Sequence, residues 1–363
     1  MIKTLDSMSK IVYLMGAGAS RGIRTADDQH KYAFRTNDIV EGMPIVSELY
    51  ERLNYIYNEI VNITPIDKQY QDIDGQYYTS KQVKESLAND IAWLRDETKR
   101  HATIDTFAKK LFLTRKSNDY QKVKSILSIF FVIEQLIGKA DSRYDTFLAS
   151  ILNSRLEIPS NIKILTWNYD RQFEFVYREY TENRYIDAIN SSQLGIFDFR
   201  SNEICNNKWS IYKINGTADF DNPLQYKLSE EQSLEFKALD YILEQYIKSI
   251  HSNGIFANNS RLYFAWENQD RTKELFMRVS QDIQDADILI VIGYTFPFFN
   301  RETDRFLFKN MPKLKKIYIQ DPNAEQLKQN IQPVLSSEQN VAGLGNHITT
   351  ITNCSQFFLP PEL

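Results

Sequence analysis

Short apolar runs alternate with longer amphipathic segments along much of this 363-residue chain. The first run, residues 10–15, is apolar without alternation, which is typical of a strand in a sheet covered on both faces. Further strands are expected at 162–167, 209–214, 261–265, 287–292 and 315–320. Helical patterns lie between them, at 172–180, 229–249, 274–283 and 300–309. Strands that alternate with helices predict an α/β fold with a doubly wound, parallel, Rossmann-like sheet.

A long stretch between the first two expected strands has a different pattern. A helix is expected to begin at Pro44, since proline suits the first turn of a helix. Four further helices are expected, and no strand-turn-strand pattern breaks the stretch: 83–95, 103–113, 123–136 and 144–152. We therefore expect a core of residues 1–50 and 156–363 with a large helical insertion at 51–155. The polar residues 21–43 read as a loop, and a lid over the site is one interpretation.

Composition and charge exclude several classes of protein. With a net charge of −4 and no long basic tract, no nucleic-acid surface is expected. The longest apolar run, 126–137, is shorter than the roughly 20 residues of a membrane span, and the N-terminus lacks the apolar region of a secretory signal. Cys205 and Cys354 lie too far apart for a metal motif or a disulfide framework. We expect a soluble, cytoplasmic protein without a membrane segment.

A glycine turn, Gly16-Ala17-Gly18-Ala19-Ser20, follows the first expected strand directly. Such a turn lets backbone N–H groups approach a pyrophosphate. Together with Gly22 the spacing is G-x-G-x-x-x-G, which differs from the G-x-G-x-x-G motif of dinucleotide-binding folds. No acidic residue ends a second strand about 20 positions further on. Both features disfavour an ordinary dehydrogenase. A tight turn without a ligand stays an alternative.

Four later strand ends also carry small or hydrogen-bonding residues. Because open parallel sheets bind ligands at the carboxyl ends of their strands, we expect these segments to form one site with the glycine turn. They are Asn168-Tyr-Asp170, Asn215-Gly216-Thr217, Gly293-Tyr294-Thr295 and Asp321-Pro-Asn323.

In this order, residues 16–20, 166–170, 213–216, 292–295 and 321–323 resemble the sirtuin-like fold family. More narrowly, they resemble the bacterial sirtuin-like NAD hydrolases of antiphage defence, over roughly 8–50 and 158–335. The resemblance implies that NAD is the substrate, cleaved to nicotinamide and ADP-ribose, and that NAD depletion serves antiviral defence. Sirtuin deacylases carry a four-cysteine zinc ribbon, which two distant cysteines cannot form, so we expect neither a deacylase nor a metal.

The resemblance also implies roles for three catalytic candidates. Asn168 would contact the nicotinamide-ribose hydroxyls and hold the attacking water, for which its amide can both donate and accept. An asparagine that only braces the loop after the strand is the alternative. Asn215 stands where the family usually has the general-base His, and it could orient the water or the ribose. Asp170 is a candidate base, although a brace for its loop is the favoured interpretation. Nicotinamide leaves as a neutral molecule, and general-base help is typically worth about 10²–10⁴-fold and not the whole rate, so loss of the His need not abolish hydrolysis.

The remaining candidates are expected to bind the rest of the dinucleotide. Gly18 and Ala19 would offer N–H groups to the diphosphate, and Ser20 a hydroxyl. Gly293 would permit close approach and Thr295 would bond a phosphate or an adenosine-ribose oxygen, while Asp321 and Asn323 would lie near the adenosine, with a helix cap as the alternative. The residues expected to bind the cofactor also include Gly16, Ala17, Gly216, Thr217 and Tyr294.

The resemblance implies control by assembly. We expect a homo-oligomer, or a complex with a separate defence partner such as a HerA-type ATPase or a short Argonaute, with the helical insertion as the assembly surface. The preference between NAD and NADP stays open. The alternative function is a regulatory subunit that binds NAD or ADP-ribose without turnover, which Asn215 favours.

Overall fold

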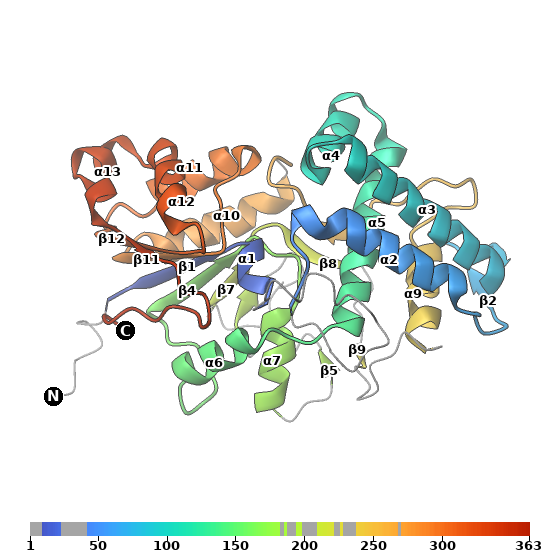
Figure 1. Cartoon of the computed structure of the whole chain (residues 1–363), viewed down its shortest axis with the longest axis horizontal. Helices are drawn as coiled ribbons and strands as arrows, with labels where there is room; N and C mark the ends of the chain where they lie inside the picture. Colours follow the sequence, from blue (N-terminus) through green and yellow to red (C-terminus); the bar gives the residue numbers. More distant parts are fainter. Residues whose placement is uncertain are drawn as a thin grey trace. The chain divides into compact units, whose positions relative to one another are not determined.

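The computed structural model describes residues 9–22, 42–181, 185–186, 194–197, 209–220, 226–227, 237–267 and 270–363. The chain divides into two compact units (Figure 1). Unit 1 comprises Met1–Gln29, Ala140–Gly216 and Phe264–Leu363, and unit 2 comprises His30–Lys139 and Thr217–Tyr263. Both units are therefore built from segments that are discontinuous in the sequence.

Unit 1 is organised around a seven-stranded sheet in the order β13-β12-β11-β1-β4-β7-β6. Every neighbouring pair of strands runs parallel, which confirms the expected parallel, Rossmann-like sheet. The strands are β1 (Ile11–Met15), β4 (Ile162–Thr166), β6 (Ile196–Phe197), β7 (Ile211–Lys213), β11 (Ile288–Ile292), β12 (Lys316–Gln320) and β13 (Ile348–Ile351). β4, β6 and β7 lie on one side of β1, and the later strands β11, β12 and β13 lie on the other, so β1 and β11 flank the topological switch point.

Side chains of the central strands alternate between two apolar cores, as the period of a β-strand requires. In β1, Val12 and Leu14 belong to one core, whereas Ile11, Tyr13 and Met15 belong to the other. All five residues of β1 are buried, as are all five of β11. This double burial explains why both strands are apolar without alternation.

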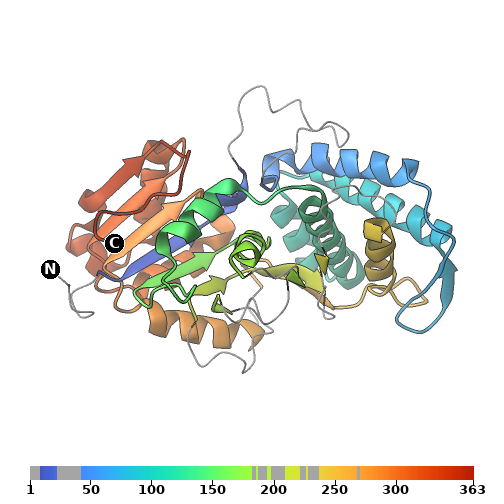
Figure 2. The ribbon, with the colours of Figure 1, turned by 90° about the horizontal axis from the view of Figure 1, so that it is seen from below.

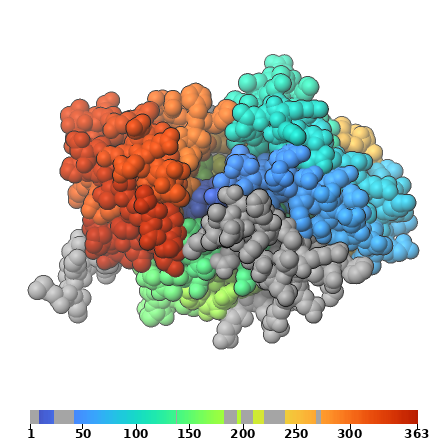
Figure 3. Space-filling view, in the orientation of Figure 1, coloured from blue at the N-terminus to red at the C-terminus, as the bar shows by residue number. Residues whose placement is uncertain are grey.

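Helices cover both faces of this sheet (Figure 2). The core that contains Tyr13 also receives side chains from α6 (Ser142–Ile151) and α7 (Gln172–Tyr180). The opposite core receives side chains from α10 (Asp270–Ile283), α11 (Arg301–Lys309) and α12 (Ala324–Ile331). In the space-filling view the outer sides of α11, α12 and α13 (Ser337–Val341) form part of the surface of unit 1 (Figure 3).

Unit 2 is mainly helical. Its helices are α2 (Leu49–Asn62), α3 (Ser80–Arg100), α4 (Ile104–Leu113), α5 (Ser117–Ile137) and α9 (Lys237–Ile247). A buried ion pair joins α2 to α5, because the Arg52 guanidinium lies 2.9 Å from the Glu134 carboxylate. A two-stranded sheet pairs β8 (Gly216–Phe220) with β10 (Ser260–Leu262).

The expectation of an uninterrupted helical stretch after residue 60 is wrong for residues 69–79. There β2 (Gln69–Gln71) and β3 (Tyr77–Thr79) form an antiparallel hairpin. The strands are polar and three residues long, so no apolar alternation marks them, and the Asp72 carboxylate holds the turn by accepting from the N–H groups of Asp74 and Gln76. Thr79 then caps α3 in a capping box with Gln82.

Most other expected elements are present, with shifted ends. The first helix of unit 2 does not begin at Pro44, because η3 (Val46–Glu48) precedes α2. β6 and β13 were not among the strands expected from the sequence. Residues 23–41, which hold most of the expected lid loop, and 228–236, at the start of one expected helix, lie outside the described residues.

The remaining short elements are α1 (Ala17–Ser20), β5 (Tyr185–Ile186), β9 (Tyr226–Lys227), η4 (Phe298–Asn300), η5 (Gln332–Val334) and η6 (Leu344–His347). The expected insertion, 51–155, and unit 2 have different bounds: α6 is in unit 1, and residues 217–263 are in unit 2. Within the ranges described above, no helix has the length and apolar character needed to cross a bilayer.

Candidate functional site

The glycine turn after β1 packs directly against the loop after β11. A Cβ on Gly293, whose φ is +58°, would lie 2.3 Å from the Ala19 nitrogen, and a Cβ on Gly18 would lie 2.8 Å from the Gly293 Cα. A Cβ on Gly16 would meet the Gly293 carbonyl oxygen at 2.7 Å. The three glycines are therefore required where two backbones touch at the switch point of the sheet.

This packing uses the N–H groups that were expected to face a diphosphate. The Gly18 N–H donates to the Gly293 carbonyl oxygen at 2.9 Å, and the Ala19 N–H donates to the Gly16 carbonyl oxygen at 2.9 Å. Neither amide is available to a ligand in this conformation. Ala17, at the start of α1, is the exposed residue of the turn.

Asn168 follows β4 and reaches back to the same turn. Its side-chain nitrogen Nδ2 donates to the Gly16 carbonyl oxygen at 2.9 Å and to Ser20 Oγ at 2.8 Å. The side chain is largely buried, with 8% of its surface exposed. The structure thus brings Asn168 and the glycine turn together, as the sequence analysis expected of neighbouring strand ends.

Ser20 is buried and does not offer its hydroxyl at the surface. Its Oγ lies 2.8 Å from the Tyr144 hydroxyl and is also hydrogen-bonded to the Asp170 carboxyl. Asp170 in turn accepts from the Gln172 N–H at the start of α7, at 3.2 Å. Burial raises the pKa of Asp170, and the nearby Lys213 ammonium opposes this shift. These contacts support the interpretation of Asp170 as a brace.

A buried ion pair, Arg143 with Asp141, also contacts the glycine turn. The Arg143 guanidinium contacts the Asp141 carboxylate at 2.6 Å and donates to the Ala19 carbonyl oxygen at 2.9 Å. Asp141 also accepts from the Gly22 N–H at 3.1 Å. Nothing in the sequence links α6 to the glycine turn, so this pair is not predicted from the sequence.

Lys213, at the end of β7, forms a buried ion pair with Glu174 of α7 at 2.9 Å. Its ammonium also donates to the Asp170 carbonyl oxygen. Buried lysines are rare unless paired, so a lysine in an otherwise apolar strand is the signal that could have revealed this contact. The pair fixes the loop that carries Asn168 to the neighbouring strand.

Asn215 lies just beyond Lys213, and 8% of its surface is exposed. Its Nδ2 donates to the Trp167 carbonyl oxygen at 3.4 Å, whereas its Oδ1 is buried and has no hydrogen-bond partner in the part of the chain that the structure describes. An unpaired buried acceptor is unfavourable, so this atom is suited to a water or a ligand group. Asn168 and Asn215 thus both direct their amide nitrogen toward main-chain carbonyl groups.

The ring of Tyr294, in the loop after β11, stacks on the ring of Trp167, with centroids 5.6 Å apart and planes inclined by 13°. Its hydroxyl donates to the Asp304 carboxyl at 2.9 Å and accepts from Asn300 Nδ2 at 3.0 Å. Burial raises the pKa of Asp304 to about 8. Tyr294 is therefore held within the protein by both its ring and its hydroxyl.

The other expected ligand-binding residues are spread more widely. Thr295 is exposed, and its carbonyl oxygen accepts from Asn330. Asp321 accepts from the Asn323 N–H at 2.8 Å, in the turn that begins α12, which is the helix-cap alternative. Burial raises the pKa of Asp321, and that N–H opposes the shift.

Residues 216 and 217 fall at a boundary between the units. Gly216, with φ of +74°, is the last residue of one segment of unit 1, and Thr217 is the first of a segment of unit 2. The Thr217 hydroxyl is buried without a partner among the described residues.

No histidine described by the structure lies in the site. His101 follows α3 and lies near Glu97 of that helix, His251 contacts Asp74 at 3.0 Å, and His347 ends η6. The described residues also contain no cluster of three or more His, Cys, Asp or Glu side chains suited to a metal ion.

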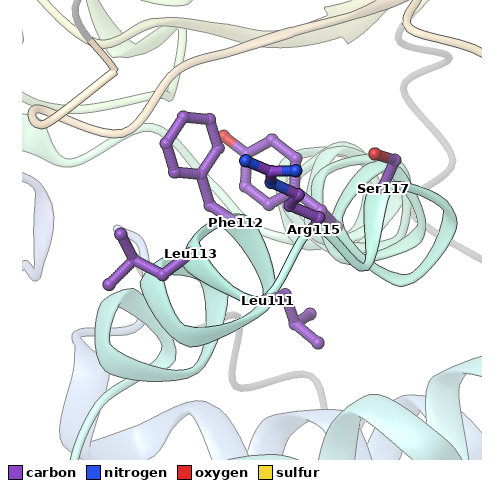
Figure 4. Close-up of a pocket in the computed structure, with 6 residues that line it drawn as sticks. Leu111, Phe112, Leu113, Arg115 and Ser117 are labelled. Atoms are coloured by element: carbon purple, nitrogen blue, oxygen red, sulfur yellow. The ribbon is translucent and has the colours of Figure 1, made fainter.

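A surface hollow lies elsewhere, in unit 2, where α4 turns into α5 (Figure 4). It is lined by Leu111, Phe112, Leu113, Arg115, Ser117 and Tyr120. None of the candidate site residues belongs to it. Three of its six lining residues are apolar, and none of the six is a His, Cys, Asp or Glu.

Comparison of the chain with protein-family models found no match, and neither did comparison with curated protein sequences.

Proposed function

We propose that unit 1 binds NAD⁺ at the carboxyl edge of its sheet and hydrolyses the bond between nicotinamide and ribose. The proposal depends chiefly on one observation: Asn168 and Asn215 follow neighbouring strands, and both donate their amide nitrogen to main-chain carbonyl groups. The amide oxygens then remain for the ligand. The switch point between β1 and β11 supports the same location, since open parallel sheets bind nucleotides there.

In the proposed reaction a water oxygen forms a bond to the ribose C1′ of an oxocarbenium-like transition state. The bond from C1′ to nicotinamide breaks, its electron pair neutralises the pyridinium ring, and the water proton goes to solvent. Asn168 and Asn215 would orient the water and the ribose through their amide oxygens. Asp170 is engaged with Ser20 and the Gln172 N–H, so the proposal gives it no role as a base.

Nicotinamide release from NAD⁺ tests this proposal, with the full chain and with its expected partner present. We expect Asn168→Ala to abolish release. Asn161→Ala is a matched control, because Asn161 precedes β4 at the opposite edge of the sheet and donates Nδ2 to the Ser9 carbonyl oxygen at 3.1 Å. If wild-type protein releases no nicotinamide in any of these assays, or if Asn168→Ala is as fast as wild type, the proposal fails.

A second candidate function is binding of NAD or ADP-ribose without turnover, as a regulatory subunit. The absence of histidine from the described part of the site favours it, since no general base is at hand. Calorimetric binding of NAD⁺ or ADP-ribose without nicotinamide release would select this candidate.

We further propose that the activity serves antiviral defence by depleting NAD, under control of self-assembly or of a partner such as a HerA-type ATPase. The resemblance of the strand-end motifs supports this role. Light scattering combined with the release assay tests it, because a fully active monomer without a partner would contradict control by assembly.

A further inference from the structure

We propose that Ser20 and Tyr144 are positioning residues that hold Asn168 with its amide oxygen toward the substrate. This inference rests on the proposed hydrolysis for its functional consequence, although the orientation itself can be measured without substrate. It concerns a buried chain of hydrogen bonds from α6 through α1 to the loop after β4.

The orientation of the Asn168 amide follows from its neighbours. The Gly16 carbonyl oxygen can only accept, so the Asn168 atom at 2.9 Å from it must be the donor Nδ2. Ser20 Oγ, at 2.8 Å, accepts from the same nitrogen. Both N–H bonds of the amide are thereby used, and the amide oxygen points away from the turn.

Ser20 can satisfy each of its neighbours at once. A hydroxyl has one proton and two lone pairs. The carboxylate form of Asp170 only accepts, so Ser20 donates its proton there and accepts from Asn168 and from the Tyr144 hydroxyl, which lies at 2.8 Å. With this assignment, every donor among these four side chains has an acceptor.

Water cannot easily replace either side chain, since Ser20 and Tyr144 are each only 1% exposed. The Tyr144 ring is held by edge contacts with Phe173 and Phe357, with centroids 4.7 and 5.0 Å apart. The ring thus fixes the hydroxyl, the hydroxyl helps to fix Ser20, and Ser20 fixes one N–H of Asn168. The catalytic amide is oriented by residues that do not touch the substrate.

The test begins with the Asn168 side-chain NH₂ signal in protein labelled with ¹⁵N-asparagine, assigned by its loss in Asn168→Ala. We expect slow hydrogen exchange in wild type, roughly 5-fold faster exchange in Ser20→Ala, and a smaller increase in Tyr144→Phe, because a net hydrogen bond is worth about 1 kcal/mol. Tyr177→Phe is the matched control, since it removes a hydroxyl that donates to the Leu156 carbonyl oxygen at 3.0 Å. Its exchange should equal that of wild type.

The second readout is kinetic. We expect kcat for nicotinamide release to fall by roughly 10-fold in Ser20→Ala with KM changed by less than about threefold, because orientation acts mainly on the transition state. If Ser20→Ala does not fold, Tyr144→Phe decides the matter, since it keeps the packed ring. Exchange at Asn168 that neither variant accelerates beyond Tyr177→Phe would overturn the inference. A wild-type protein with slow, Ser20-dependent exchange but no nicotinamide release would overturn only the proposed hydrolysis.

Discussion

Asp304 should make the stability of unit 1 fall as the pH rises. Its carboxyl is buried at the start of α11, and the described residues pair it with the Tyr294 hydroxyl but with no cation. Burial raises its pKa from 3.8 to about 8. Between these values the native state keeps a proton that the unfolded chain has released, so unfolding becomes more favourable with each unit of pH.

The size of the effect follows from the shift. Each unit of pKa difference corresponds to about 1.4 kcal/mol, so the native state loses at most about 4 kcal/mol from this group between pH 5 and pH 8. Asp304→Asn removes the titration and keeps an acceptor for Tyr294. Its free energy of unfolding should therefore depend less on pH than that of wild type by up to that amount.

Urea unfolding at pH 5, 6, 7 and 8 at constant ionic strength measures this difference. Tryptophan emission is a suitable signal, because Trp167 stacks on Tyr294. Other carboxyls whose pKa burial raises, such as Asp170 and Asp321, are common to both proteins and cancel in the comparison. Glu302→Gln, an exposed site in the same helical turn, makes the same change of charge and should reproduce the wild-type slope.

Parallel curves for wild type and Asp304→Asn over this range would refute the reasoning. They would mean that Asp304 ionises in the native state near its ordinary pKa. A change of slope in Glu302→Gln as large as that in Asp304→Asn would refute it equally, because the effect would then be one of net charge.

Two further substitutions test the scaffold of the site. Lys213→Met should lower the free energy of unfolding by about 3–5 kcal/mol, since it leaves the buried Glu174 carboxylate without its partner, and adding Glu174→Gln should recover part of this loss. Gly293→Ala should cost several-fold more stability than Gly343→Ala, whose φ is also positive but whose added Cβ meets only a side-chain atom at 3.5 Å. Urea denaturation measures both, and equal losses for the two alanines would contradict the close packing of the turns.

The sequence predicts the sheet well, because its central strands are buried on both faces. Ile288–Ile292 and Ile11–Met15 are apolar at every position, so no register or turn information is needed to recognise them. Short strands cannot be recognised from a run of apolar residues in this way. Gln69–Gln71 buries only its central residue, and β6 is two residues long, so neither shows a period.

For the candidate site, the sequence places the strand ends but not their hydrogen bonds. Asn168 and the glycine turn are adjacent because β1 and β4 are neighbours in the sheet. The fold class predicts only that both segments lie at the same edge of a parallel sheet. The partner of Ser20 on α6 is Tyr144, which lies 124 residues further along the chain, and no local pattern marks it. The sequence also could not predict that Gly18 packs against another backbone segment. A turn that binds phosphate and a turn that packs on another backbone both need glycine.

The position of β11 in the chain has a consequence for synthesis. β1 pairs with β11 through Ile11 and Ile288, which are 277 residues apart. At about 5–20 residues per second, the ribosome needs roughly 15–55 s to make the intervening chain. During that time one edge of β1 has no partner and exposes unpaired backbone groups, which are prone to wrong pairing. Nascent chains stalled before residue 288 should therefore bind chaperones more strongly than chains stalled after residue 320.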